Sequence, residues 1–418
     1  MTSNRLTRYI LVALVTGIAT GYVINISVTP EQAKDAAYYF SIVTGVFLQL
    51  IKMIIAPLVL STLIVGVAHM GSGGAVGRTF VRTLAWFITA SIVSLSLGIL
   101  MVNLLAPGVG VGLPLPAADA ATGLAKKAFD LKEFVLHIFP KSIFEAMATN
   151  EVLQIVVFSL FAGVGLIAIG DQGKPIVRGL DALMALMLTV TGYVMKVAPF
   201  AVFAAVASSI AVEGLGILIV FGKFIGGFYL ALAMLWAVLL GAGAAVLGFP
   251  AIRRLVRDIR EPFLITFATA SSEAAYPKML EALERFGVPN RIASFVLPLG
   301  YSFNLDGSMM YCAFASIFIA QAYGIDLSLS QEIFMLGLLM ITSKGIAGVP
   351  RASLVVIAAT LPYFNIPEAG LLLILAVDHF LDMGRSATNV IGNAVATAVV
   401  AKWDTSGDEA AALVAATE

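Results

Sequence analysis

The sequence predicts an all-α polytopic membrane protein. Of its 418 residues, 60% are hydrophobic and only 12% are charged, which is outside the range of soluble domains. The mean hydropathy is +0.98, and the apolar residues stand in long runs rather than in short alternating segments. Runs of about 20 apolar residues match a membrane-spanning helix, whereas a membrane β-barrel needs short alternating strands.

Composition also excludes several functional classes. The formal net charge is zero, so nothing favours nucleic acid as a partner. The single cysteine, Cys312, excludes an internal disulfide and a cysteine metal cluster. The histidines, His69, His137 and His379, lack the spacing of metal ligands. We therefore expect no transition metal and no cofactor.

Six hydrophobic runs in the first 250 residues are expected to cross the membrane. They cover residues 9–26, 39–70, 83–106, 134–170, 180–212 and 215–248. The first run could be a signal peptide, but it lacks a small-residue cleavage site before the acidic segment 31–35, so a spanning helix is expected. Residues 71–82 are expected to form a short loop, and residues 107–133 a longer flexible one.

The basic residues predict the orientation. Those that fall on one side are Arg5, Arg8, Arg78, Arg82, Lys174, Arg178, Arg253, Arg254, Arg257 and Arg260. The positive-inside rule places that side in the cytoplasm, although Lys126 and Lys127 oppose it weakly. We expect a bacterial inner-membrane protein with both termini in the cytoplasm. The basic cluster 253–260 also suits lipid headgroups.

After residue 252 two short apolar segments are interrupted in the same way. The first runs into TASSEAAYP (269–277) and the second into TSKGIAGVP (342–350), each with Thr at its start and Pro eight residues later. Asn304 lies 27 residues beyond the first interruption and Asp378 lies 28 beyond the second, which indicates a weak internal repeat. Paired broken segments at membrane depth indicate a transporter site, and two ordinary kinked helices or loops are the alternative.

A spanning run between these segments, 295–323, is interrupted by SFNLDGS (302–308). Gly307 loosens the helix and exposes backbone carbonyls. Asn304 and Asp306 add side-chain oxygens, the ligands that hard cations prefer. The segment is thus a candidate cation site, although an NxDG sequence is also a common turn.

The last apolar run, 371–401, carries five polar residues in one helical stripe. They are Asp378, Asp382, Arg385, Asn389 and Asn393, at spacings of 4, 3, 4 and 4. A charge at the bilayer centre costs at least about 2.5–3.5 kcal/mol, so such residues face a polar cavity or a partner. The stripe predicts one wall of a binding site, and the alternative is an Asp–Arg pair that only locks helices together.

The candidate groups suit an acidic amino acid. Arg385 is a planar cation for a carboxylate, Asp382 is an anion for an ammonium group, and Asn389 can bind a second carboxylate. Ser271 and Ser272 would add hydroxyl and backbone donors at the end of a half-helix, where helix capping is the alternative role.

These motifs resemble the glutamate/aspartate and C4-dicarboxylate:cation symporters. The resemblance covers most of the chain, is sharpest over 260–403, and depends on ASSEAAYP, NLDGS, GIAGVP and VDHFLDMGRSATNVIGN followed by AKW. It implies that each chain has eight transmembrane helices and two re-entrant hairpins, built as inverted repeats. It also implies a homotrimer that transports by an elevator mechanism. The implied units are a scaffold in 1–250, whose third and sixth helices can move with the core, a transport core in 251–403 and a polar tail in 404–418. The implied core elements are hairpin 1 (about 252–290), helix 7 (291–323), hairpin 2 (331–365) and helix 8 (366–402).

The resemblance also implies roles for individual residues. The implied substrate-binding residues are Ser271, Ser272, Ser308, Gly348, Val349, Asp382, Arg385 and Asn389. The implied cation-binding residues are Ser91, Gly300, Ser302, Asn304, Asp306, Ser343, Asn389 and Asn393. Several of the latter would act through backbone carbonyls.

Departures from the family pattern leave the coupling cation open. Asn393 stands where sodium-coupled amino-acid members usually have aspartate. Phe87 and Ala90 stand where a tyrosine and a threonine help to bind sodium, although Ser91 is kept.

The two hairpins depart as well. Glu273 and Lys344 are similar to the C4-dicarboxylate branch, and Arg351 occupies a usually small position. A desolvated carboxylic acid is protonated more easily, so a proton could be the coupling ion. The candidate proton carriers are Glu273, Asp306 and Asp382.

The predicted function is symport of aspartate or glutamate, coupled to H⁺, Na⁺ or both. A C4-dicarboxylate is the alternative substrate, and Asp382 disfavours it because a substrate without an ammonium group leaves that anion unpaired. A gated anion channel is a further alternative. No nucleophile–base pair or metal cluster in the sequence supports an enzyme.

Overall fold

The computed structural model describes residues 3–70, 73–110, 131–214, 221–342, 352–375 and 377–404. Within these ranges the chain is helical and contains no strand, which confirms the all-α class. Six described helical segments are long and apolar enough to cross a membrane. They are Arg8–Ser27, Pro30–Ala68, Gly74–Leu105, Val152–Val194, Gly222–Leu247 and Asn290–Ala322.

The first three helices are α1 (Ser3–Ser27), α2 (Pro30–Ala68) and α3 (Gly73–Leu105). Helix α2 begins with a capping box in which the Thr29 and Gln32 side chains bind each other's backbone N–H groups. The loop expected at 71–82 is wrong from Gly73 onward, because α3 already includes Arg78 and Arg82. The C-terminal end of α19 (Asp378–Asp404) fixes these turns, since Asp404 accepts from Thr79 Oγ1 (2.7 Å) and from Arg82 Nη1 (3.1 Å).

The middle of the chain is more broken than predicted. Its helices are α4 (Leu131–Ile138), α5 (Ile143–Ala148), α6 (Val152–Ile169), α7 (Lys174–Val194), α8 (Ala198–Glu213) and α10 (Gly222–Leu247), with a 3₁₀ turn, η1 (Gly170–Gly173). The expected single span 134–170 is wrong, because the helix stops before Pro140 and again at Asn150, whose φ is +55°. The expected span 180–212 is interrupted between α7 and α8, just before Pro199.

The second half supplies most of the buried helices. They are α11 (Phe249–Asp258), α12 (Arg260–Thr269), η2 (Glu273–Ala275), α13 (Tyr276–Phe286), α14 (Asn290–Phe303), α15 (Asp306–Ala322), α16 (Leu329–Thr342), α17 (Ala352–Thr360), η4 (Leu361–Phe364), η5 (Glu368–Gly370), α18 (Leu371–Leu375) and α19. The helix breaks at 270–272 and 304–305 lie where the sequence predicts them. The run 371–401 is divided into α18 and α19, but all five stripe residues belong to α19.

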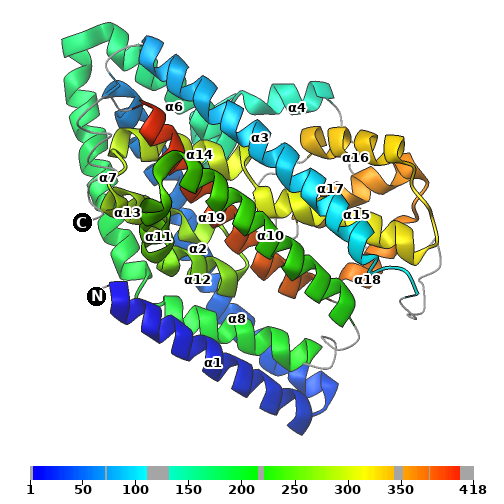
Figure 1. Ribbon diagram of the computed structural model, residues 1–418. Helices are drawn as coiled ribbons and strands as arrows, with labels where there is room; N and C mark the ends of the chain where they lie inside the picture. Colours follow the sequence, from blue (N-terminus) through cyan, green and yellow to red (C-terminus); the bar gives the residue numbers. More distant parts are fainter. Residues whose placement is uncertain are drawn as a thin grey trace.

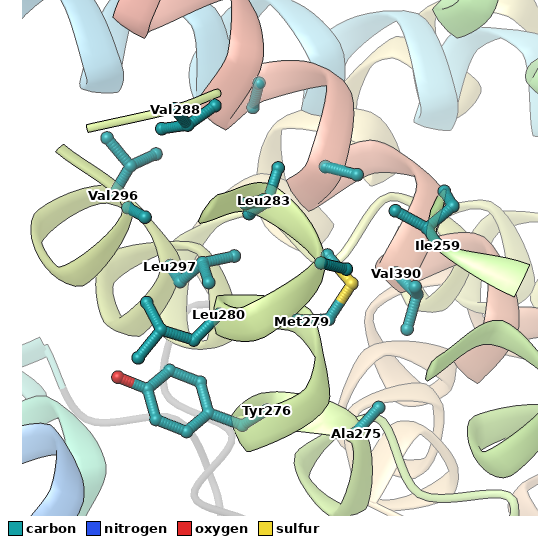
Figure 2. Packing of buried hydrophobic residues seen from close by; sticks show 14 of the residues in the cluster. Ile259, Ala275, Tyr276, Met279, Leu280, Leu283, Val288, Val296, Leu297 and Val390 are labelled. Atoms are coloured by element: carbon teal, nitrogen blue, oxygen red, sulfur yellow. The ribbon is translucent and has the colours of Figure 1, made fainter. Parts of the chain in front are cut away.

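Helix α13 anchors the first broken segment in the core. Its Tyr276, Met279 and Leu280 are buried, and Figure 2 shows them beside Leu297 of α14 and Val390 of α19. Close packing of these large side chains holds the segment against both helices.

Helix α19 lies in the middle of the protein, and every residue from Ser386 to Ala401 is buried. It packs against α10, α12, α14 and α15. Figure 1 shows α1 and α8 side by side along one edge, with α12 between them and α19. The polar stripe therefore points into protein rather than into lipid.

Close packing of α1 on α8 gives a stability prediction. A Cβ atom added to Gly21 would lie 2.7 Å from the Ala207 carbonyl oxygen, whereas one added to Gly241 of α10 would have no atom within 4 Å. We expect Gly21→Ala to lower stability by about 1–3 kcal/mol through overpacking, and Gly241→Ala to leave it unchanged or raise it by up to about 1 kcal/mol. Thermal unfolding of both variants tests this, and equal midpoints would contradict it.

Candidate functional site

The centre of the site is the Arg385 guanidinium on α19. Its Nε donates to the Asp382 carboxylate, and its Nη1 donates to Ser308 Oγ at 2.8 Å. The guanidinium also lies over the Tyr311 ring, 5.9 Å from the ring centroid. The Arg385 and Asp382 side chains are only 11% and 12% exposed, so two opposite charges face each other almost out of solvent. Asp382 and Arg385, which the sequence places three residues apart on one helical face, are therefore in contact.

Asn389 attaches the start of α15 to this centre. Its Oδ1 accepts from the backbone N–H groups of Gly307 (2.9 Å) and Ser308 (3.3 Å), which are first-turn donors without an intrahelical acceptor. Its Nδ2 donates to Ser308 Oγ at 3.2 Å. A Cβ atom on Gly307 would overlap the Arg385 carbonyl oxygen, so the close approach requires glycine. Asn389 thus caps a helix in this structure, and its role toward a substrate carboxylate stays a prediction.

Tyr311 is a member of the group that the sequence analysis missed. Its hydroxyl donates to Asp378 Oδ1 at 2.8 Å, while its ring faces Arg385. It follows Ser308 by three residues and therefore lies on the same face of α15. This spacing is the sequence signal that could have indicated Tyr311 as a site residue. The stripe residue Asp378 thus binds the side chain whose ring faces Arg385.

The first broken segment lies beside α19. Ala270 ends α12 in the left-handed region at φ +52°, and its carbonyl accepts from Ser386 Oγ at 3.1 Å. Ser386 follows Arg385 directly, so the break approaches the charged centre. Ser271 Oγ accepts from the Ala274 N–H at 3.4 Å, which is the capping role considered for these serines. Ser272 is half-buried.

Glu273 belongs to the side of this segment that packs against α2. The charges that act on it come from Lys52 of α2 and from Glu151. One turn later the Tyr276 and Thr62 hydroxyls lie 3.3 Å apart, which links α13 to α2. Glu273 therefore interacts with a helix of the N-terminal half.

A second polar cluster lies about one turn N-terminal to Ser308, around Asn304 and Asp306. Asn304 Nδ2 donates to Asp306 Oδ2 and to Asn393 Oδ1, both at 3.1 Å, and Ser94 Oγ donates to Asp306 Oδ1 at 3.2 Å. Asn304, Asp306 and Asn393 are fully buried. Asn304 Oδ1 and Asn393 Nδ2 have no hydrogen-bond partner, although both atoms are buried.

Two glycines let the helices meet at this cluster. A Cβ atom on Gly300 would overlap the Asn393 amide, and one on Gly392 would overlap the Asp306 carboxylate. The carboxylate of Asp306 and the vacant acceptor Asn304 Oδ1 suit a small cation, which prefers oxygen ligands. Asn393 contributes a neutral amide where a carboxylate would have added charge.

The remaining predicted site residues lie either on described helices or outside the described residues. Ser91 is buried on α3, as are Phe87 and Ala90, and Ser302 is half-buried on α14. Five predicted positions lie outside the described residues, namely Ser343, Lys344, Gly348, Val349 and Arg351.

Membrane-length helices around a buried, charged helix define an integral membrane protein of many spans with a polar centre. Comparison with known proteins identifies the group. The model of the sodium:dicarboxylate symporter family matches residues 6–403, so the chain belongs to this family of transporters.

Curated relatives of both substrate classes are similar to this chain. The proton/sodium-glutamate symport protein of Bacillus caldotenax is 39% identical over 400 residues, covering 94% of this chain and 93% of the relative. The C4-dicarboxylate transport protein of Laribacter hongkongensis is 38% identical over 405 residues, covering 96% and 89%. The C4-dicarboxylate transport protein 2 of Mesorhizobium japonicum is 39% identical over 407 residues, covering 96% and 90%.

The neutral amide of Asn393 leads to a prediction about sodium. Asn393→Asp adds a second buried carboxylate to the cluster, which costs stability without a cation and strengthens binding of one. Because a ligand stabilises the folded state it binds, replacing choline chloride with NaCl should raise the unfolding temperature of Asn393→Asp more than that of the wild type. Asn393→Ser is the neutral control, and the same response in all three proteins would contradict the prediction.

Proposed function

We propose that this protein is a secondary active symporter that carries aspartate or glutamate, coupled to H⁺, Na⁺ or both. The observation that supports this most is the Arg385–Asp382 pair. In a buried site, each charge needs an opposite partner, because an isolated one costs several kcal/mol. An amino acid with an acidic side chain brings both partners, a carboxylate for the guanidinium and an ammonium group for Asp382.

The hydroxyl of Ser308 fits the same proposal. It accepts from Arg385 Nη1 and Asn389 Nδ2, so both donors converge on one small oxygen. A substrate carboxylate that displaced this oxygen would receive hydrogen bonds from both residues. Charge-assisted bonds to a planar guanidinium are among the strongest available to a protein.

C4-dicarboxylates are the second candidate substrate. The relatives named for C4-dicarboxylate transport support it, because they are as similar to this chain as those named for glutamate. A dicarboxylate could use Arg385, but its second carboxylate would meet Asp382 unless a proton came between them. This repulsion is our reason for placing it second.

The coupling ion is proposed from the Asn304–Asp306–Asn393 cluster. Vacant Asn304 Oδ1 and the Asp306 carboxylate favour a cation there. With one carboxylate in the cluster, a single sodium ion or a proton balances its charge. Asp306, Asp382 and Glu273 are the proposed proton carriers.

For the architecture we propose eight transmembrane helices with two re-entrant hairpins, assembled as a homotrimer in the inner membrane with cytoplasmic termini. The scaffold in residues 1–250 would stay fixed, apart from its third and sixth helices, which can move with the core of 251–403 as it slides as an elevator. Shared packing of α12, α13, α14 and α15 around α19 supports the core as one unit.

Uptake into liposomes tests the proposed function. Wild-type protein should accumulate labelled aspartate above its outside concentration when a sodium gradient, a proton gradient or both are imposed. Separate gradients identify the coupling ion, and Glu273→Gln should weaken uptake if a proton is used. Arg385→Ala is the background control, and equilibration without accumulation would contradict symport.

Asp382→Asn separates the two substrate classes. The asparagine cannot pair with an ammonium group, and a hydrogen bond to a charged group contributes about 1.5–3 kcal/mol. We expect the affinity for aspartate to fall by about tenfold or more, with a smaller loss or a gain for succinate. Competition binding with both ligands measures this, and equal losses would argue against ammonium recognition.

A further inference from the structure

An apolar cavity of about 290 Å³ lies apart from the polar clusters, between two groups of helices. Its lining residues come from α1 and α8 and from α10, α12 and α19. Figure 1 shows α1 and α8 side by side, with α12 between them and α19. Its lining includes Ile18, Ile210, Tyr229, Phe267, Phe380 and Met383. The volume is at the lower end of the range of about 300–1,000 Å³ typical of ligand pockets.

The chemistry of the lining disfavours a charged occupant. No Asp, Glu, Lys or Arg lines the cavity, so a charged solute would lose its hydration without compensation. The Tyr229 hydroxyl is already used, because it donates to the Phe380 carbonyl at 2.6 Å. His379 packs its ring edge-on against Phe380, with the ring centroids 6.2 Å apart. Ser209 and His379 are the other polar side chains in the lining, and the remaining lining residues are apolar, so the walls favour an apolar occupant.

The position of the cavity indicates what surrounds it. Leu14 and Ile18 line it from the middle of the span Arg8–Ser27, which is hydrocarbon depth. Ile18 is also partly exposed on the outer side of α1, where Val15 is 63% exposed. Helix α1, which lines the cavity, thus also exposes side chains at the depth where hydrocarbon is the solvent.

We propose that this cavity binds one acyl chain of a membrane lipid. The chain replaces empty space with dispersion contacts to side chains of both walls. The inference extends the proposed function, which assigns α1 and α8 to the scaffold and α12 and α19 to the moving core. A chain held between them would stabilise whichever arrangement of scaffold and core binds it more tightly, since a ligand shifts an equilibrium by its differential affinity.

Photolabelling in liposomes tests the inference. The probe is phosphatidylcholine with a diazirine in the middle of one acyl chain, diluted into phosphatidylcholine vesicles that contain the full-length protein. Met383 is 9% exposed, so labelling there requires a chain to enter the cavity. Labelling at Val15 reports ordinary contact with lipid.

Two substitutions on α8 make the test specific. Ser209→Phe places a ring in the cavity, whereas Val212→Phe adds the same ring on the same helix at a 44% exposed residue outside the lining. We expect labelling of Met383 in the wild type and in Val212→Phe, and its loss in Ser209→Phe with Val15 labelling retained. If Ser209→Phe does not fold, Ile210→Trp fills the same space.

Two results would overturn the inference: labelling of Val15 without Met383 in the wild type, and unchanged Met383 labelling in the filled variant. The first result would mean that the cavity stays empty. Labelling does not depend on transport, so a protein that takes up no aspartate can still bind the chain. The proposed function and this inference can therefore fail separately.

Discussion

The ion pair between Arg385 and Asp382 is the constraint on which the site depends. Two charges removed from water must be compensated by each other and by further hydrogen bonds. The structure meets this need with Ser308 and Tyr311, both from α15. To bring α15 so close, Asn389 caps its first turn and Gly307 removes the Cβ atom that would collide with α19.

The same turn of α15 connects the two polar clusters. Asp306 belongs to the cluster with Asn304 and Asn393, while Ser308, two residues later, contacts Arg385. A cation at Asp306 and a solute at Arg385 would therefore act on one short piece of backbone. Under the proposed function, this continuity offers a physical route for coupling, because a shift of the turn by either ligand alters the geometry met by the other.

Local signals in the sequence predicted much of the site, and tertiary contacts explain the rest. The spacing of Asp382, Arg385 and Asn389 fixed one face of a helix, and Gly307 predicted the break before α15. Tyr311 was missed, because an aromatic residue in an apolar helix is predicted to be a core residue. Its contacts with Arg385 and Asp378 appear only in the tertiary structure. The early start of α3 was missed for a similar reason, since it depends on Asp404, more than 300 residues away. The electrostatic interaction of Glu273 with Lys52 of α2 likewise could not follow from the sequence of the first broken segment, which specifies a break but not the helix beside it.

Under the proposed function, the guanidinium of Arg385 exchanges its internal partner, Asp382, for a substrate carboxylate. A structure of the protein determined with bound L-aspartate tests it most directly. The account predicts a substrate carboxylate on the guanidinium, the amino group at Asp382, and the Arg385–Asp382 contact opened. Aspartate bound elsewhere, with the contact between the two side chains intact, would contradict it.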